Sequence, residues 1–190
     1  EPAWMLGFRR KRTNLHEKYD HPSWREMRDA AAVALHLGGG LSPREVRDLK
    51  VEDVIPAAGA HRVSRVVVRA HGQTPRREVP LALWASRVLA QWLAVREAQK
   101  FDGSWLLPST GRGSQWKKGA HNLAVADVLR LAGFPEDTQM GGCFRLRHTY
   151  ALRQLAHGTP LTDLGALLGL RDEEALQRYR TVVPARVKVY

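Results

Sequence analysis

Apolar residues recur along much of this chain with the spacing of one helical face. The clearest case lies between residues 81 and 99, where Val88, Trp92 and Val95 follow one another at intervals of four and three. This pattern is typical of an amphipathic helix that packs against a core. By this pattern and by capping residues, helices are predicted over residues 23–37, 42–50, 81–99, 121–132, 146–157, 161–169 and 173–180.

Local signals mark where the first two helices begin and end. Ser23 with Glu26, and Ser42 with Glu45, have the spacing of a capping box, in which each side chain bonds the other residue's backbone. Pro after Ser42 suits the first position of a helix. The run Gly38–Gly40 ends the first helix, since glycine readily adopts the backbone conformation that follows a helix.

Two short segments have strand character. Residues 62–69 are rich in valine and partly alternate, and residues 77–81 are a weaker second strand. The intervening residues 71–75 carry turn chemistry, which indicates a hairpin. The predicted fold is therefore mostly α with a small antiparallel β-hairpin sheet. Residues 1–22 are predicted to be a basic arm or linker, and residues 23–190 one domain.

The charge balance points to a polyanionic partner. The 190 residues hold 30 Lys and Arg against 19 Asp and Glu, a net charge of +11. Both halves of the chain share this surplus, so no single tail explains it. Nucleic acid is the commonest partner of such a protein, and arginine can grip phosphate with two donors. A high-GC genome would also raise the arginine content.

Several classes of protein are excluded by what the sequence lacks. The single cysteine, Cys143, rules out a disulfide framework and multi-cysteine zinc sites. The eight histidines show no ligand spacing, and no phosphate-binding glycine loop is present, so neither a metal nor a cofactor is expected. No apolar run has the length of a membrane span. A soluble cytoplasmic protein, associated with the nucleoid, is expected.

Three segments, in this order and spacing, resemble the catalytic domain of the tyrosine recombinases, the phage integrase family. The first is Gly40–Leu49, and the second is Leu146-Arg147-His148-Thr149-Tyr150-Ala151. The third is Leu167–Leu170, with Tyr179 nine residues after it. The resemblance covers about residues 23–183. It implies that fold, and it places the predicted hairpin where the family has one.

The resemblance also implies a chemistry. In the family a tyrosine hydroxyl attacks a DNA phosphodiester and forms a 3′-phosphotyrosine, which splits strand exchange into two easier steps. Two arginines and two imidazole or indole positions stabilise the extra negative charge of the transition state. A lysine on the hairpin serves as the general acid.

Only part of this catalytic set is carried over. Arg147 matches the second family arginine and Tyr179 the nucleophile, with His148 a possible further participant. The first arginine position holds Ser42, which a helix N-cap explains, and the hairpin turn has no lysine. Phe144 and Leu170 replace the two imidazole positions and are expected to fill the vacated space as core. Three residues that could compensate are Arg44, His71 and Arg76.

These observations lead to an expected function with two alternatives. The favoured hypothesis is a protein that binds double-stranded DNA, is catalytically impaired, and acts on or regulates a mobile element, plasmid or phage. The first alternative is an active recombinase or integrase that cleaves DNA through Tyr179; the second is a protein–protein assembly module that kept the fold. The predicted DNA contacts are Arg44, Arg47, Arg76, Arg77, Arg112, Lys117, Lys118 and Arg145.

The resemblance implies partners as well. Family members clamp DNA with a separate N-terminal core-binding domain, and this sequence contains none, so a fragment of a longer protein is expected. The C-terminal segment often packs on a neighbouring protomer in the family. A homo-oligomer, or a complex with a related recombinase, is therefore expected.

Overall fold

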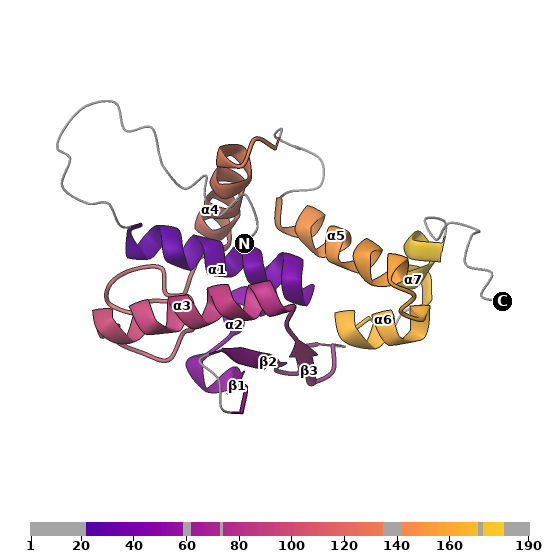
Figure 1. Ribbon diagram of the computed structural model, residues 1–190, viewed down its shortest axis with the longest axis horizontal. Coiled ribbons are helices and arrows are strands. Elements are labelled where there is room, and N and C mark those ends of the chain that lie inside the picture. The colour runs from indigo at the N-terminus through magenta and orange to yellow at the C-terminus, as the bar shows by residue number, and fades with distance from the viewer. Residues whose placement is uncertain (1–21, 59–61, 73, 135–141, 171–172, 181–190) are drawn as a thin grey trace.

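The computed structural model describes residues 22–58, 62–72, 74–134, 142–170 and 173–180. The predicted basic arm lies outside these residues except for its last position. The helices and strands of the described part follow the predicted order closely (Figure 1). None of its helices is long and apolar enough to span a lipid bilayer.

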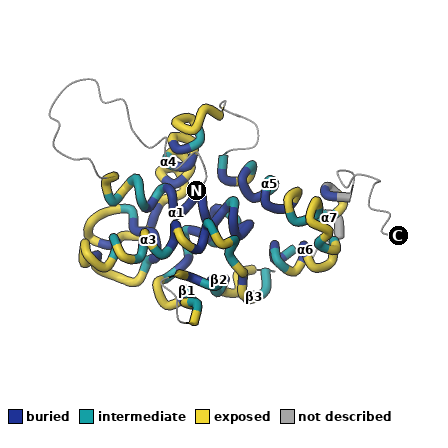
Figure 2. Tube along the Cα trace, viewed as in Figure 1, coloured by how far each residue is buried: buried dark blue, intermediate teal, exposed yellow. Residues whose placement is uncertain are grey.

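Helix α1 (Trp24–Gly39) is the centre of the molecule and packs against α3 (Leu83–Gln99), α4 (Lys118–Leu131) and α5 (Gly142–Ala156). Small residues let α1 and α3 approach closely. Ala30 and Ala34 of α1 are buried against Ala85 of α3, and a Cβ at Gly38 would overlap the Cβ of Ala85. Figure 2 shows the resulting band of buried residues along α1.

Both predicted capping boxes are confirmed. The Ser23 and Glu26 pair opens α1, and the Ser42 and Glu45 pair opens α2 (Pro43–Asp48). Gly40 ends α1 with a φ of 67°, a left-handed conformation in which a side chain is strained.

The sheet contains one strand more than predicted. Strands β1 (Val54–Pro56), β2 (Val63–Val68) and β3 (Arg77–Pro80) pair antiparallel in the order β1-β2-β3. The β2–β3 hairpin confirms the prediction, with Val66 opposite Val79. The prediction missed β1, which follows a 3₁₀ turn at Val51–Asp53 and is only three residues long.

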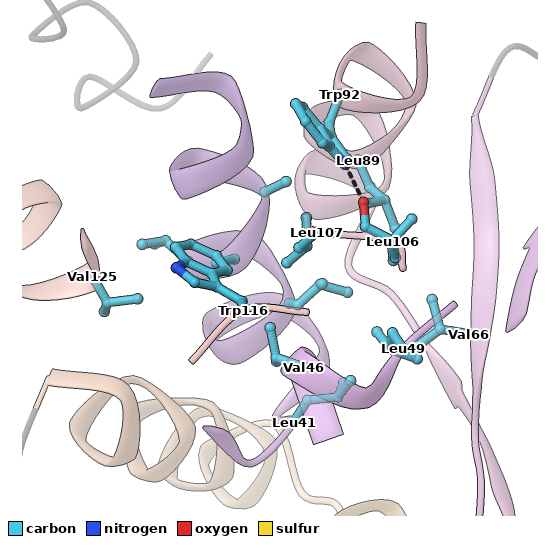
Figure 3. Packing of buried hydrophobic residues seen from close by; sticks show 14 of the residues in the cluster. Leu41, Val46, Leu49, Val66, Leu89, Trp92, Leu106, Leu107, Trp116 and Val125 are labelled. Carbon is cyan, nitrogen blue, oxygen red and sulfur yellow. Dashed lines mark hydrogen bonds between the residues drawn. The ribbon is translucent and has the colours of Figure 1, made fainter. Parts of the chain in front are cut away.

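An irregular segment completes the main core (Figure 3). Leu106 and Leu107 are fully buried although they belong to no helix or strand. The indole Nε1 of Trp92 donates a 2.9 Å hydrogen bond to the Leu106 carbonyl, and the Leu106 amide donates to the Leu49 carbonyl at 2.9 Å. These bonds satisfy backbone groups that would otherwise be buried without partners.

The C-terminal helices form a second, smaller core. Helices α6 (Leu161–Leu168) and α7 (Glu173–Arg180) pack with the end of α5 around Tyr150, Leu164, Leu168 and Tyr179. Two predicted helix starts were wrong, since α4 begins at Lys118 rather than 121 and α5 at Gly142 rather than 146. Lys118 is therefore the first residue of α4.

Candidate functional site

Arg147 is held by groups that come from three different elements. Its Nη1 donates to the Gly40 carbonyl at 2.6 Å, and its Nη2 donates to the Leu168 carbonyl at 2.7 Å. Nη1 also lies 3.3 Å from Oε2 of Glu45. These contacts join the middle of α5 to the ends of α1 and α6 and to α2, so they fix the guanidinium firmly.

Glu45 receives a second arginine on its other oxygen. Nη1 of Arg77 lies 2.7 Å from Oε1 of Glu45, and Nε of Arg77 donates to the Leu167 carbonyl at 2.9 Å. Burial alone raises the pKa of the Glu45 carboxyl. The hydrogen bond and charge of Arg77, the Ser42 amide and the charge of Arg147 outweigh this effect and hold the pKa below its usual value.

The side chain of Arg77 is only 8% exposed. Its predicted role was a contact to DNA, and the structure places its guanidinium inside the ion pair with Glu45 instead of on the surface. In this arrangement Arg77 connects β3 to α2 and to the end of α6, which is a structural role.

His148 and Tyr179, named separately by the sequence analysis, lie side by side in the structure. Nδ1 of His148 lies 2.7 Å from the phenolic oxygen of Tyr179, which is 4% exposed overall. The hydroxyl can donate this bond when Nδ1 is unprotonated, so the imidazole is placed to accept the phenolic proton. Leu170 packs against the same cluster as a partly buried residue, not as a fully buried one.

A pocket of about 320 Å³ brings together positions that are far apart in the sequence. Ser42 and Phe144, which replace an arginine and an imidazole of the family pattern, both line it. Three of the predicted DNA contacts also line it, namely Arg44, Arg47 and Lys118. This hollow, rimmed by cations, is hereafter the α2–α5 pocket; Pro43, Asn122 and Cys143 complete its lining.

Phe144 does not fill the space left by the missing imidazole. Its side chain is an exposed large hydrophobic with 49% of its surface accessible, so the prediction that it lies in the core was wrong. Because α5 begins at Gly142, Phe144 stands in the first turn of the helix, at the mouth of the α2–α5 pocket.

The other predicted contacts do not line the α2–α5 pocket. Arg44 forms an ion pair with Asp48. It also lines a second hollow, of about 270 Å³, together with Arg69 and His71 of the hairpin. Arg145 lies over the ring of Phe134 at 5.9 Å. Three further predicted DNA contacts are exposed and line neither hollow, namely Arg76, Arg112 and Lys117.

Sequence reasoning missed the part played by two acids. Glu45 was recognised only as a capping residue, and its two oxygens in fact accept from two arginines. Asp53 pairs with Arg69 at 2.8 Å and accepts from the Lys50 amide at 2.8 Å. The signal was the charge itself, since an acid that becomes buried needs a partner.

Within the described ranges, one group of three side chains has the composition of a metal site. The ligand atoms of His36, His121 and Cys143 lie within 4.8 Å of one another, and all three residues are buried. Burial lowers the pKa of His36 to about 4 and that of His121 to about 3. Burial also raises the pKa of the Cys143 thiol to about 12.

Comparisons with known proteins agree with the geometry. The sequence model described as "Phage integrase family" matches residues 13–186. Tyrosine recombinase XerC of Methylobacterium sp. (strain 4-46) is 30% identical over 169 residues, which cover 88% of this chain and 50% of that protein. Tyrosine recombinase XerD of Bradyrhizobium diazoefficiens is 29% identical over 154 residues, which cover 74% of this chain and 46% of that protein. The chain spans about half the length of these curated relatives.

Solved structures show the same fold. A XerH site-specific recombinase bound to a palindromic difH substrate superposes with a TM-score of 0.72 at 19% identity, over 90% of this chain and 46% of that one. XerA recombinase superposes with a TM-score of 0.64 at 19% identity, over 92% of this chain and 68% of that one. The mostly helical fold with a small sheet is the fold of these recombinases.

Proposed function

Because this chain belongs to the phage integrase family, we propose that it binds double-stranded DNA across the face that carries the α2–α5 pocket, and that it cleaves DNA poorly or not at all. One observation carries the proposal: the pocket keeps Arg44, Arg47 and Lys118 on its rim, while Ser42 and Phe144 stand at two of the positions that stabilise the transition state in the family. The chain thus keeps cations that attract a DNA phosphate, but it has fewer fixed donors to stabilise the transition state of cleavage.

DNA is the partner that the charge and the relatives support. The net charge is +11, and contacts from lysine and arginine to phosphate account for most of the affinity of such proteins. Among the similar structures, a XerH recombinase is bound to its difH substrate and a lambda integrase dimer to a core site. A homo-oligomer, or a complex with a related recombinase, on DNA is part of the proposal.

The expected loss of activity follows from the number of groups replaced. Removing one preorganised donor of this kind costs about 10²–10³-fold in rate. Removing a general acid costs about 10²–10⁴-fold. Such losses do not add simply within one site, but several together bring strand cleavage close to background. The biological role we propose is an accessory or regulatory one for a mobile element, plasmid or phage.

A second candidate function rests on one contact. The bond between His148 and Tyr179 supplies the tyrosine with a proton acceptor, and Arg147 is rigidly held nearby on the same helix as His148. This favours strand cleavage through Tyr179, with Arg44 or the exposed His71 and Arg76 serving in place of the missing cations.

Binding is tested by fluorescence anisotropy with labelled duplexes from the protein's own genetic locus, over a series of salt concentrations. We expect the logarithm of the binding constant to fall linearly with that of the salt concentration, by about 0.9 per phosphate neutralised. Arg44→Ala and Lys118→Ala should each weaken binding and flatten the slope. Arg87→Ala removes an exposed arginine of α3 and is the matched control. Binding without salt dependence, or none, would instead favour an assembly module.

Cleavage is tested with nicked duplexes of the same sequences, which trap a covalent intermediate resistant to SDS. The proposal expects no more adduct from the wild-type chain than from Tyr179→Phe. An adduct that depends on Tyr179 would overturn the proposed impairment and establish the second candidate, whatever the binding assay gives.

A further inference from the structure

We propose that His36, His121 and Cys143 form a binding site for a thiophilic divalent cation of the Zn²⁺ type where α1, α4 and α5 meet. Each helix contributes one ligand, and the three residues are 0%, 0% and 3% exposed. Two imidazoles and a thiolate are the ligand set that zinc prefers. This inference goes beyond DNA binding and does not depend on it.

The separation of the ligand atoms fits a tetrahedral ion. Nε2 of His36 lies 3.2 Å from Nε2 of His121, and the three ligand atoms span at most 4.8 Å. At a zinc–nitrogen distance of about 2.0–2.1 Å, two nitrogens of a tetrahedral site are about 3.3 Å apart. The histidine pair therefore needs almost no movement to bind, and Cys143 needs a small one.

The tautomer of His36 is already the one that a ligand requires. Its Nδ1 lies 2.8 Å from the Leu41 carbonyl, which can only accept, so Nδ1 carries the proton. Nε2 then presents a lone pair towards His121. A backbone carbonyl that holds the far nitrogen of a metal-bound histidine in this way is a common second partner in metal sites.

Hydrogen bonding within the pair does not by itself account for the two buried rings. If Nε2 of His36 accepts, then Nε2 of His121 must donate, and Nδ1 of His121 is left as a bare lone pair. That atom is buried and has no hydrogen-bond partner. Such an orphan costs about 1–3 kcal/mol in a folded protein. An ion bound through Nε2 of both rings removes the need for one Nε2 to donate to the other, and Nδ1 of His121 then carries the ring proton.

The α2–α5 pocket gives the ion a way in and a fourth coordination position. Cys143 and Asn122 line this pocket, and Sγ of Cys143 lies 3.6 Å from Oδ1 of Asn122. Water or Asn122 can occupy the fourth position. Arg28 and Arg47 lie close enough to act on His121 and disfavour added positive charge, so the negative charge of a thiolate is needed to balance the ion.

Binding is accompanied by release of one proton. The neutral thiol of Cys143 loses its S–H proton to solvent and its sulfur electron pair forms the bond to the ion, while both neutral imidazoles donate a lone pair. The net charge of the filled site is then +1. The ion would tie together three helices, and Cys143 lies four residues before Arg147 on α5, so it would also fix the helix that carries Arg147 and His148.

The test uses the full 190-residue chain without an affinity tag, freed of metal by a chelator. Titration with Co²⁺ should saturate at one equivalent, with a thiolate-to-cobalt charge-transfer band and the strong visible bands of a tetrahedral ion. Zn²⁺ should displace the cobalt, and competition with a chromophoric chelator gives its affinity. Cys143→Ser should abolish the charge-transfer band, and Cys143→Ser and His121→Gln should each weaken Zn²⁺ binding at least about 100-fold. His157→Gln, an exposed histidine at the end of α5, should stay within about 2-fold of the wild type.

Each outcome is decisive. A wild-type spectrum without a charge-transfer band at one equivalent would overturn the proposal, and this result needs no variant to fold. Equal affinity of the wild type and Cys143→Ser would overturn it as well. Circular dichroism identifies a variant that has lost its fold, in which case the wild-type spectrum decides.

Discussion

The phenolic oxygen of Tyr179 lies 2.7 Å from Nδ1 of His148, although the two residues are 31 positions apart in the sequence. Their rings are tilted at 49° with centroids 5.7 Å apart. Helix α7 is thus held to α5 through the hydroxyl of its tyrosine as well as through apolar contacts. A tyrosine kept only as packing would not need this hydroxyl.

Tyr179→Phe should destabilise the protein by about 1 kcal/mol, because it removes a part-buried hydrogen bond and leaves Nδ1 of His148 without that partner. The free energy of unfolding in urea measures the change. His148→Phe combined with Tyr179→Phe should cost less than the sum of the single changes, because the two residues interact. Strict additivity would contradict the contact.

Restoring the family residues should restore cleavage. The triple change Ser42→Arg, Phe144→His and Leu170→His returns cationic groups around the α2–α5 pocket and beside Tyr179. We expect covalent adduct on nicked duplexes to rise at least about 100-fold, since one donor of this kind contributes 10²–10³ in rate. The same triple change with Tyr179→Phe is the control and should form none.

Ser42→Arg by itself should lower stability. Ser42 accepts from the Glu45 amide as the N-cap of α2, and loss of such a cap costs about 1 kcal/mol. Urea denaturation measures this cost. Ser42→Asp keeps a capping oxygen and should cost much less, which separates loss of the cap from other effects at this position.

Glu45→Gln should be among the most damaging single changes. It removes the charge shared by the buried side chains of Arg77 and Arg147, and breaking a buried pair costs about 3–5 kcal/mol. Glu52→Gln, an exposed acid that pairs with Arg69, is the control and should change stability little. Equal effects would mean that the buried pairs do not form in solution.

Glu45 also sets a dependence on acid. Its folded pKa lies below the usual value, so its stabilising contribution is present above the unfolded pKa. The contribution is lost as the pH falls through the lower folded pKa. The free energy of unfolding should therefore decline below about pH 4.5, and it should decline less in Glu45→Gln.

As the pH falls, His36 and His121 should begin to lower the stability of the metal-free protein at a higher pH than Glu45 does. Burial lowers their pKa values to about 4 and about 3, below the 6.5 of an unfolded histidine. The unfolded chain therefore binds more protons, and stability falls as the pH drops below 6.5 towards 4. For His36 the loss is on the order of 3 kcal/mol. Denaturation at a series of pH values from 7 to 4 in the presence of chelator measures it.

Features that depend on neighbouring residues could be predicted from the sequence. The starts of α1 and α2 follow from capping boxes that close within four residues, and the β2–β3 hairpin follows from its turn. Strand β1 could not be predicted, because three residues carry no periodicity and pairing with β2 alone makes them a strand. The resemblance pointed to Arg147 and Tyr179, and both are buried in the structure.

Features that depend on partners distant in the sequence could not be predicted from it. Arg77 reads as a surface cation until Glu45, 32 residues away, is seen to accept from it. Phe144 reads as core because it is apolar, yet it stands at the mouth of a pocket. His36 and His121 are 85 residues apart and show no ligand spacing, so their approach appears only when α1 and α4 are packed together.

The contacts of Arg147 bear on how degenerate relatives are interpreted. Two backbone carbonyls and a buried carboxylate accept from this guanidinium, and each would lose a donor if the arginine were replaced. The fold therefore uses the arginine whether or not the chain cleaves DNA. An arginine retained at this position is therefore no evidence of strand cleavage by itself; under the proposed function, positions 42 and 144 are the informative ones.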